Sequence, residues 1–87
     1  MSKHDELLAK VLSGASDANI RYKDLCNLLL RLGFSVREGK GSHKVFTYPG
    51  IPEQLTLQPS GNKAMPYQVK SVRRLITTHK LLDPSDE

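Results

Sequence analysis

The sequence feature that most constrains the fold is a change in hydrophobic period at Gly33. Before this glycine, four leucines follow the i, i+3, i+4, i+7 spacing of a helix that buries one face. After it, residues 34–38 alternate apolar and polar side chains, as a half-buried strand does. Glycine is also the residue that most often ends a helix. This pattern predicts a helix followed directly by a sheet; the leucines are Leu25, Leu28, Leu29 and Leu32.

Two clusters of turn-forming residues divide the middle of the chain into expected strands. Residues 42–48 are rich in β-branched and aromatic side chains, and residues 54–58 alternate again. Pro-Gly-Ile-Pro at 49–52 and Pro-Ser-Gly-Asn at 59–62 are expected to break the pattern. Strands this closely linked predict an antiparallel meander with one face on the helices.

Two further helices are expected at the ends of the chain. Residues 5–13 carry an apolar stripe, and residues 13–19 read as a loop. A last helix should begin near Pro66, a residue suited to the first helical position, and end near residues 79–82. The sequence thus predicts one α+β domain at residues 20–82, preceded by an extension at 1–19 and followed by an acidic tail at 83–87.

The charge is distributed unevenly along the chain. Thirteen Lys and Arg residues against nine Asp and Glu give a net charge of +4, but residues 54–82 carry five bases and no acid. A stretch of one sign favours a polyanion such as nucleic acid, or an acidic protein. A solvated helix face is the alternative interpretation.

Several other classes of protein are disfavoured. The single cysteine, Cys26, excludes an internal disulfide, fits a reducing compartment and is expected to act as a small, partly buried apolar side chain. The chain has no run of 18 apolar residues, so no membrane helix is predicted. The segment after Met1 is not apolar, so no signal peptide is predicted, and the cytoplasm is expected. Scattered acids and three dispersed histidines do not suggest a metal site, and no cofactor is expected.

The segment Gly39-Lys40-Gly41-Ser42-His43-Lys44 is the candidate site for chemistry. His43 is the candidate catalytic residue, because imidazole can take and give a proton near neutral pH. Glycine lets a ligand approach the backbone closely, and the two lysines carry charge that suits phosphate. The alternatives are a surface histidine in a turn and lysines that only keep a hairpin soluble.

These residues, with two other segments, resemble HicA-type toxins, the mRNA-cleaving half of type II toxin–antitoxin pairs. The resemblance rests on residues 28–34 (Leu-Leu-Leu-Arg-Leu-Gly-Phe), on Gly41-Ser42-His43 at the start of a strand, and on residues 66–69 (Pro-Tyr-Gln-Val). It implies a double-stranded-RNA-binding-like α-β-β-β-α fold with both helices on one sheet face. It also implies metal-independent ribonuclease activity with His43 as the catalytic residue, and a HicB-type antitoxin as partner.

The resemblance departs from the family pattern at the N-terminus. Many HicA-like chains begin almost at the helix that here starts near residue 21, so residues 1–19 form an extension. This extension either packs on the core or joins an interface with a partner.

Metal-free RNA cleavage uses the 2′-OH of the substrate as nucleophile and needs a base, an acid and positive charge around the phosphate. His43 can be the base or the acid. Lys40, Lys44 and Tyr48 are candidates for the second group by proximity, although a lysine suits charge stabilisation better. Ser42 either stabilises the turn or bonds to His43. The residues expected to contact RNA are Lys40, Gly41, Ser42, Lys44, Lys63, Lys70, Arg73 and Arg74.

The accessibility of His43 depends on which face of its strand is buried. His43, Val45 and Thr47 share one face, and Lys44, Phe46 and Tyr48 share the other. We expect Phe46 to point into the core, which leaves His43 on the open face; burial of Val45 would invert this arrangement. Two rival functions remain on the same fold, a non-catalytic double-stranded-RNA-binding module and a pure protein-interaction domain.

Overall fold

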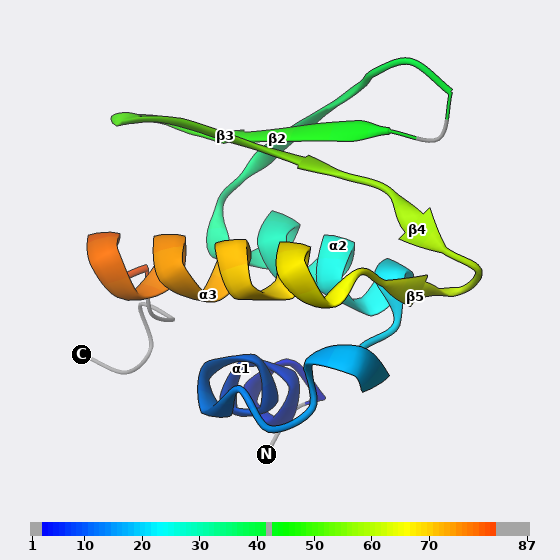
Figure 1. The fold of residues 1–87 in the computed structure, drawn as a ribbon. Helices are drawn as coiled ribbons and strands as arrows, with labels where there is room; N and C mark the ends of the chain where they lie inside the picture. Colours follow the sequence, from blue (N-terminus) through cyan, green and yellow to red (C-terminus); the bar gives the residue numbers. More distant parts are fainter. Residues whose placement is uncertain (1–2, 42, 82–87) are drawn as a thin grey trace.

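The computed structural model describes residues 3–41 and 43–81. Its helices are α1 (Lys3–Ser13), the 3-10 helix η1 (Asp17–Asn19), α2 (Tyr22–Leu32) and α3 (Pro66–His79). Its strands are β1 (Ser35–Glu38), β2 (Lys44–Tyr48), β3 (Ile51–Leu57), β4 (Pro59–Ser60) and β5 (Lys63–Ala64) (Figure 1). From α2 to α3, the main elements follow the predicted α-β-β-β-α order, which confirms the α+β, double-stranded-RNA-binding-like fold.

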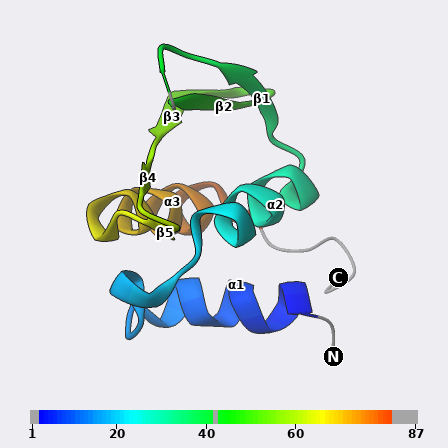
Figure 2. The ribbon, with the colours of Figure 1, turned by 90° about the vertical axis from the view of Figure 1, so that its right-hand side faces the viewer.

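The elements stack in three layers. The sheet β1-β2-β3 covers one side of the α2/α3 pair, and α1 lies on the other side of that pair (Figures 1 and 2). Both α2 and α3 therefore lie on one face of the sheet, and its other face is not covered by any described element. The N-terminal extension packs on the core through the buried side chains of Leu8 and Val11.

The sheet is antiparallel, and its register decides which side chains reach the core. Phe46 of β2 lies opposite Val36 of β1 and Leu55 of β3. The Phe46 side chain is fully buried, whereas Val45 is only partly buried. The prediction that Phe46 points inward is thus confirmed, and the Val45 face of β2 is the outer one.

Helix α2 ends where the sequence indicated. Gly33 adopts a left-handed conformation with φ 112°, and its N–H donates to the carbonyl oxygens of Leu29 and Leu30. A Cβ atom at Gly33 would lie 3.1 Å from the ring of Tyr48, so the close approach of β2 also requires glycine here. The chain can then turn at once into β1.

Two of the expected strands differ from the structure. Strand β1 was predicted to be half buried, but all four of its residues are exposed because it is an edge strand that the helices do not cover; Val36 remains 40% exposed. The break predicted at 49–52 is only the two-residue turn at Pro49 and Gly50, so β3 begins at Ile51 rather than at residue 54. Strand β3 tolerates Pro52 because it is the opposite edge of the sheet.

Two expected loops contain short regular structure. The segment 59–62 was predicted to be a plain break, yet β4 and β5 pair around it. This hairpin is tied to α2 by a bridge between Arg21 and Lys63. The predicted loop at 13–19 contains η1, and α1 begins at Lys3, two residues before its predicted start. The acidic tail lies outside the described residues.

Candidate functional site

The loop between β1 and β2 is closed by two backbone hydrogen bonds that position His43. The N–H of Gly39 donates to the carbonyl of His43 at 2.9 Å, and the N–H of His43 donates to the carbonyl of Lys40 at 3.1 Å. A Cβ atom at Gly39 would lie 3.3 Å from the Cβ of His43. Gly41 adopts φ +61°, with open space around it. Both glycines therefore shape this turn; Gly39 was predicted to lie in the candidate segment but not to contact RNA.

The imidazole of His43 is oriented by the same turn. Its Nδ1 lies 2.8 Å from the carbonyl oxygen of Lys40. Because a carbonyl only accepts hydrogen bonds, Nδ1 must carry the hydrogen of this contact. In the neutral ring, Nε2 then holds the free lone pair. The His43 side chain is partly exposed.

Gln68 joins the end of β3 to the first turn of α3 through hydrogen bonds. This buried side chain donates from Nε2 to the carbonyl of Thr56 and accepts through Oε1 from the N–H of Gln58, each at 3.2 Å. The amide thus bonds to the edge of β3 much as a neighbouring strand would. Sequence reasoning missed Gln68, because a polar residue next to the apolar stripe of a helix gives no signal of its partner.

A second polar side chain, Tyr22 at the start of α2, bonds to the end of β3. The Tyr22 hydroxyl donates to the carbonyl of Leu57 at 3.3 Å. Burial, with smaller effects from Cys26 and Glu38, raises the pKa of Tyr22 to about 12. Burial also raises the pKa of Cys26, against the lowering effects of its hydrogen bond with Tyr22 and of Lys44. Both groups are therefore protonated at neutral pH, and the predicted apolar role of Cys26 agrees with its burial.

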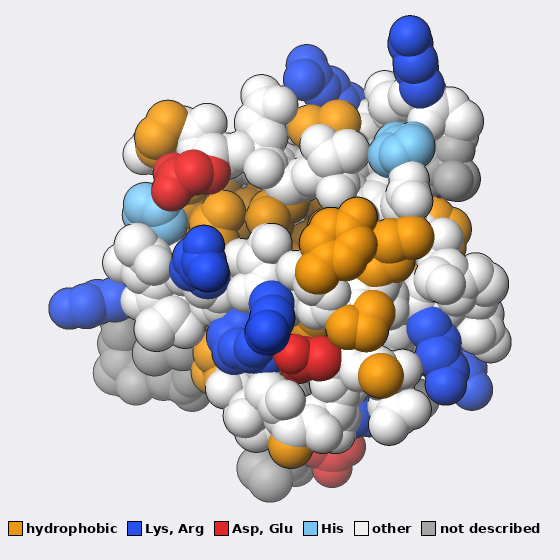
Figure 3. All heavy atoms as spheres, viewed as in Figure 1, with side chains coloured by type: hydrophobic (Ala, Val, Ile, Leu, Met, Phe, Trp, Pro, Cys, Tyr) orange, Lys and Arg blue, Asp and Glu red, His pale blue; other side chains and the backbone are white. Residues whose placement is uncertain are grey.

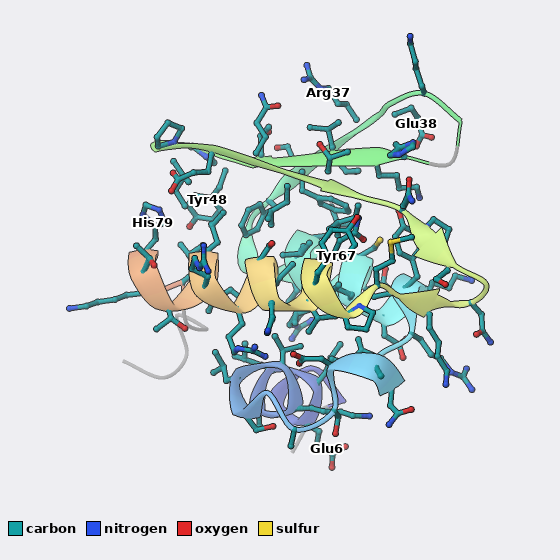
Figure 4. The ribbon with its side chains drawn as sticks, viewed as in Figure 1. Glu6, Arg37, Glu38, Tyr48, Tyr67 and His79 are labelled. Atoms are coloured by element: carbon teal, nitrogen blue, oxygen red, sulfur yellow. The ribbon has the colours of Figure 1, made fainter. Side chains whose placement is uncertain are left out.

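Tyr48 does not lie near His43. The two residues are five positions apart along an extended chain, a distance of roughly 16 Å at about 3.3 Å per residue. The Tyr48 ring packs against Phe34, with ring centroids 5.1 Å apart. This contact lies at the opposite end of the sheet from Glu38, the last residue of β1 before the β1–β2 loop (Figure 4). The prediction that Tyr48 is a second proton-transfer group by proximity is therefore wrong, because an extended strand separates its two ends.

The lysines that were predicted to contact RNA before α3 lie in different environments. Lys40 is exposed in the turn. Lys44 is partly buried and shares the inward face of β2 with Phe46, so it lies under the sheet end near Cys26. Lys63 is exposed on β5 beside Arg21, a further cation that sequence spacing could not place here. Ser42 lies outside the described residues.

The predicted basic face of α3 is divided between two sides of that helix. The Arg73 guanidinium donates through Nη1 to Asp17 at 2.9 Å and to the carbonyl of Val11 at 3.1 Å. Arg73 therefore joins α3 to the N-terminal extension, and its side chain is only 22% exposed. Lys70 and Arg74 are exposed and make no such contact with the extension among the described residues.

Arg74 lines a groove of about 250 Å³ between β3 and α3. Leu55 and Leu75 contribute apolar side chains to it. The other residues that line the groove are Glu53, Gln54, Ser71 and Thr78. Figure 3 shows this face of the molecule, with apolar side chains across its centre.

The β1–β2 loop, the β4–β5 hairpin and the first turns of α2 and α3 lie at one end of the molecule (Figures 1 and 2).

The described part of the chain also limits other kinds of site. Across residues 3–41 and 43–81, no three His, Cys, Asp or Glu side chains gather where they could hold a metal ion. Within the same ranges, no helix combines the length and the apolar character needed to cross a membrane.

Two helices on one face of a three-stranded antiparallel sheet, with a histidine fixed in the first hairpin, place the chain among small α+β proteins with a double-stranded-RNA-binding-like fold. A family model described as the HicA toxin of bacterial toxin–antitoxin systems matches residues 22–77, which is more than half of the chain. The chain therefore belongs to the HicA toxin family and is a toxin of a toxin–antitoxin pair. No curated protein and no solved structure matches it significantly. The family match begins at α2, so α1 lies outside it.

Proposed function

We propose that this chain is a metal-independent endoribonuclease that cleaves mRNA with His43 and is neutralised by a HicB-like antitoxin in the cytoplasm. Membership of the HicA toxin family supports the class of activity. The observation that carries the assignment of His43 is the 2.8 Å contact between its Nδ1 and the Lys40 carbonyl. This contact orients the ring and leaves Nε2 as the nitrogen that can accept a proton when the ring is neutral.

The proposed reaction begins with proton transfer to Nε2 of His43 from the 2′-OH of the substrate. The 2′-oxygen attacks the adjacent phosphorus, and the bond from phosphorus to the 5′-oxygen breaks. The products are a 2′,3′-cyclic phosphate and a 5′-OH: a water molecule donates the proton to the leaving oxygen, and the resulting hydroxide takes the proton back from the His43 imidazolium. The Lys40 carbonyl accepts a hydrogen bond from Nδ1 throughout, so it also stabilises the imidazolium that forms. General base catalysis of this kind contributes roughly 10²–10⁴ in rate.

Exposed cations around the hairpin and on α3 supply the proposed RNA contacts. Lys40 lies in the turn next to His43, and Lys63 is exposed on β5. Lys70 and Arg74 extend this surface along α3. The proposed set also includes Gly41 and Ser42 of the turn sequence and Lys44, which is only partly exposed. Arg73 is excluded from it, because its guanidinium is engaged with Asp17 and Val11.

The antitoxin is proposed to cover His43 and these cations with an acidic surface. Complementary charge speeds association and excludes wrong partners. A partner held in this way would block RNA from the hairpin and from α3 at once.

A non-catalytic double-stranded-RNA-binding module is the second candidate, and the fold is the observation that favours it. Such domains read duplex RNA by shape and by phosphate contacts, which require no histidine. The two candidates differ in what the loss of His43 does.

The test is cleavage of a long RNA by the purified chain in excess EDTA, with His43→Ala beside the wild type. His79→Ala is the matched control, because His79 lies at the end of α3, with its Nε2 3.6 Å from the Glu53 carboxylate and far from the β1–β2 loop. We expect the wild type and His79→Ala to leave cyclic-phosphate ends and His43→Ala to cut at least about 100-fold more slowly. Equal RNA binding without cleavage by any variant would replace the enzyme with the binding module. Equal cleavage by all three would remove His43 from the mechanism.

A further inference from the structure

Tyr67 is an aromatic side chain that the core does not use. It is 63% exposed, the highest value among the large apolar side chains of the described residues. It lies in the first turn of α3, where Figure 4 labels it. Its carbonyl accepts a hydrogen bond from Ser71, but no hydrogen bond holds its side chain within the described ranges. Tyrosine is enriched at binding interfaces because its ring is apolar and its hydroxyl is polar, so this exposed ring is a candidate contact for a ligand.

The sheet register brings the first turn of α3 to the end of the sheet next to His43. Lys44, the residue after His43, pairs with Leu57, the residue before Gln58. Gln58 in turn bonds to residues on both sides of Tyr67, through its side chain to the N-cap residue Met65 and through its N–H to Gln68. Gln58 therefore joins the strand end next to His43 to the turn that carries Tyr67.

We propose that Tyr67, with Met65 and Gln58, forms a subsite that binds one nucleobase of single-stranded RNA beside His43. The Tyr67 ring supplies a flat face on which a base stacks. The partly exposed thioether of Met65 extends this apolar surface. The Gln58 amide donates one hydrogen bond to the Met65 sulfur, which leaves its oxygen and its second N–H to bond to a base edge. This inference rests on the proposed ribonuclease function and adds its substrate class.

The required ligand is a single strand because a base in a duplex has both faces covered by its neighbours. The geometry of α3 extends the site in one direction. Ser71 and Arg74 follow Tyr67 by four and seven residues, so the three lie along one side of the helix and lead into the groove beside β3. A strand stacked on Tyr67 can therefore pass its next phosphates to Arg74.

Gln68 fixes the subsite relative to the reacting group. Its two hydrogen bonds hold the first turn of α3 against the strand opposite His43. A base stacked on Tyr67 would thus be held at a constant position from Nε2 of His43, which orients the neighbouring sugar and phosphate for attack. An exposed tyrosine is also a common contact in protein interfaces. Its place in the turn that Gln58 joins to the strand end next to His43, on the side of α3 that carries Arg74, favours RNA.

The experiment measures binding of a 2′-O-methyl single-stranded oligoribonucleotide, which lacks the nucleophile and cannot be cut. It compares the full-length wild type with Tyr67→Ala, Tyr67→Phe and Leu30→Ala. Leu30 is the matched control, because it is also apolar and exposed but lies near the far end of α2. We expect Tyr67→Ala to weaken binding roughly ten-fold and Tyr67→Phe and Leu30→Ala to change it less than about two-fold. Urea unfolding of each variant verifies that stability is unchanged.

A Tyr67→Trp variant tests stacking itself, since the chain contains no other tryptophan. Its fluorescence should be quenched by the oligoribonucleotide and not by the same strand with abasic positions. Tyr67→Ala that binds and cuts RNA as the wild type does would overturn this inference alone and leave the ring to a protein contact. A wild type that neither binds the strand nor cuts RNA would overturn the proposed function and this subsite together.

Discussion

The two sides of the α2/α3 helix layer have different characters. On one side the sheet contributes Phe46 to the core but leaves its hairpin, its outer face and the groove beside α3 accessible. On the other side α1 closes the surface with Leu8, Val11 and the ion pair between Arg73 and Asp17. The sheet side carries every feature that we assign to chemistry, whereas the α1 side carries features that hold the chain together.

Arg73 and Arg74 make this difference visible in two neighbouring residues. They have the same charge, and a helix turns by about 100° between them. That rotation directs Arg73 to the extension and Arg74 to the groove. A basic pair in a helix is therefore not one functional unit, and each side chain must be assigned from the surface that it faces.

The largest expected loss of stability follows a substitution on the sheet side. Phe46→Ala should lower the free energy of unfolding by about 3–5 kcal/mol, because it removes a fully buried ring from between the sheet and the helices. Val45→Ala, on the outer face of the same strand, should lower it by no more than about 1 kcal/mol. Urea unfolding followed by circular dichroism measures both. Equal losses would mean that the two faces of the sheet are not distinguished as described.

The α1 side should respond to the loss of Arg73. Arg73→Ala leaves Asp17 and the Val11 carbonyl without their donor, and we expect a loss of about 2 kcal/mol in stability. Arg74→Ala, one residue further on, should change stability by less than about 0.5 kcal/mol because its side chain is exposed. Urea midpoints of the two variants provide the comparison. If they match, the ion pair does not hold the extension.

Much of this architecture could be predicted from the sequence. The leucine stripe and Gly33 located α2 and its end, and Pro66 located the start of α3, because helix period and terminal residues act locally. His43, which follows Gly39 and Gly41, could be placed at the end of a turn for the same reason. Residue types at short spacing carry this information directly.

The remainder depends on contacts between distant parts of the chain. The exposure of β1 follows from how far the helices extend under the sheet, which no local pattern records. Arg73 pairs with Asp17, which is 56 residues away, and Gln68 bonds to a strand that precedes it. The same limit applies to Tyr67, whose turn is joined through Gln58 to the strand end next to His43. Such partners become visible only when the fold is known.

A smaller loss of stability is expected in alkaline solution, from Tyr22 on the sheet side. The folded state raises the pKa of Tyr22 to about 12, mainly through burial, against about 10 in an unfolded chain. The neutral phenol therefore favours folding: its contribution is complete below pH 10 and is lost as the pH rises through 12. Cys26, whose pKa is also raised by burial, contributes in the same direction at somewhat lower pH.

This pH dependence can be isolated with Tyr22→Phe, which keeps the ring and removes the titrating group. The free energy of unfolding of the wild type should fall more steeply between pH 10 and 12 than that of the variant. Titration of lysines affects both proteins alike, so the difference between the curves is the quantity to measure. Parallel curves would show that Tyr22 titrates normally in the folded chain.

The smallest expected effect returns to the two arginines, now in RNA binding. Each phosphate contact contributes roughly 0.7 to the slope of log affinity against log salt for a single strand. Arg74→Ala should reduce that slope by about one contact, because its exposed guanidinium faces the groove that leads from Tyr67. Arg73→Met should leave the slope unchanged while lowering stability, since its guanidinium contacts Asp17 rather than RNA. A reduced slope for Arg73→Met and not for Arg74→Ala would reverse the roles of the two sides of α3, and the RNA path would then have to run along the α1 side.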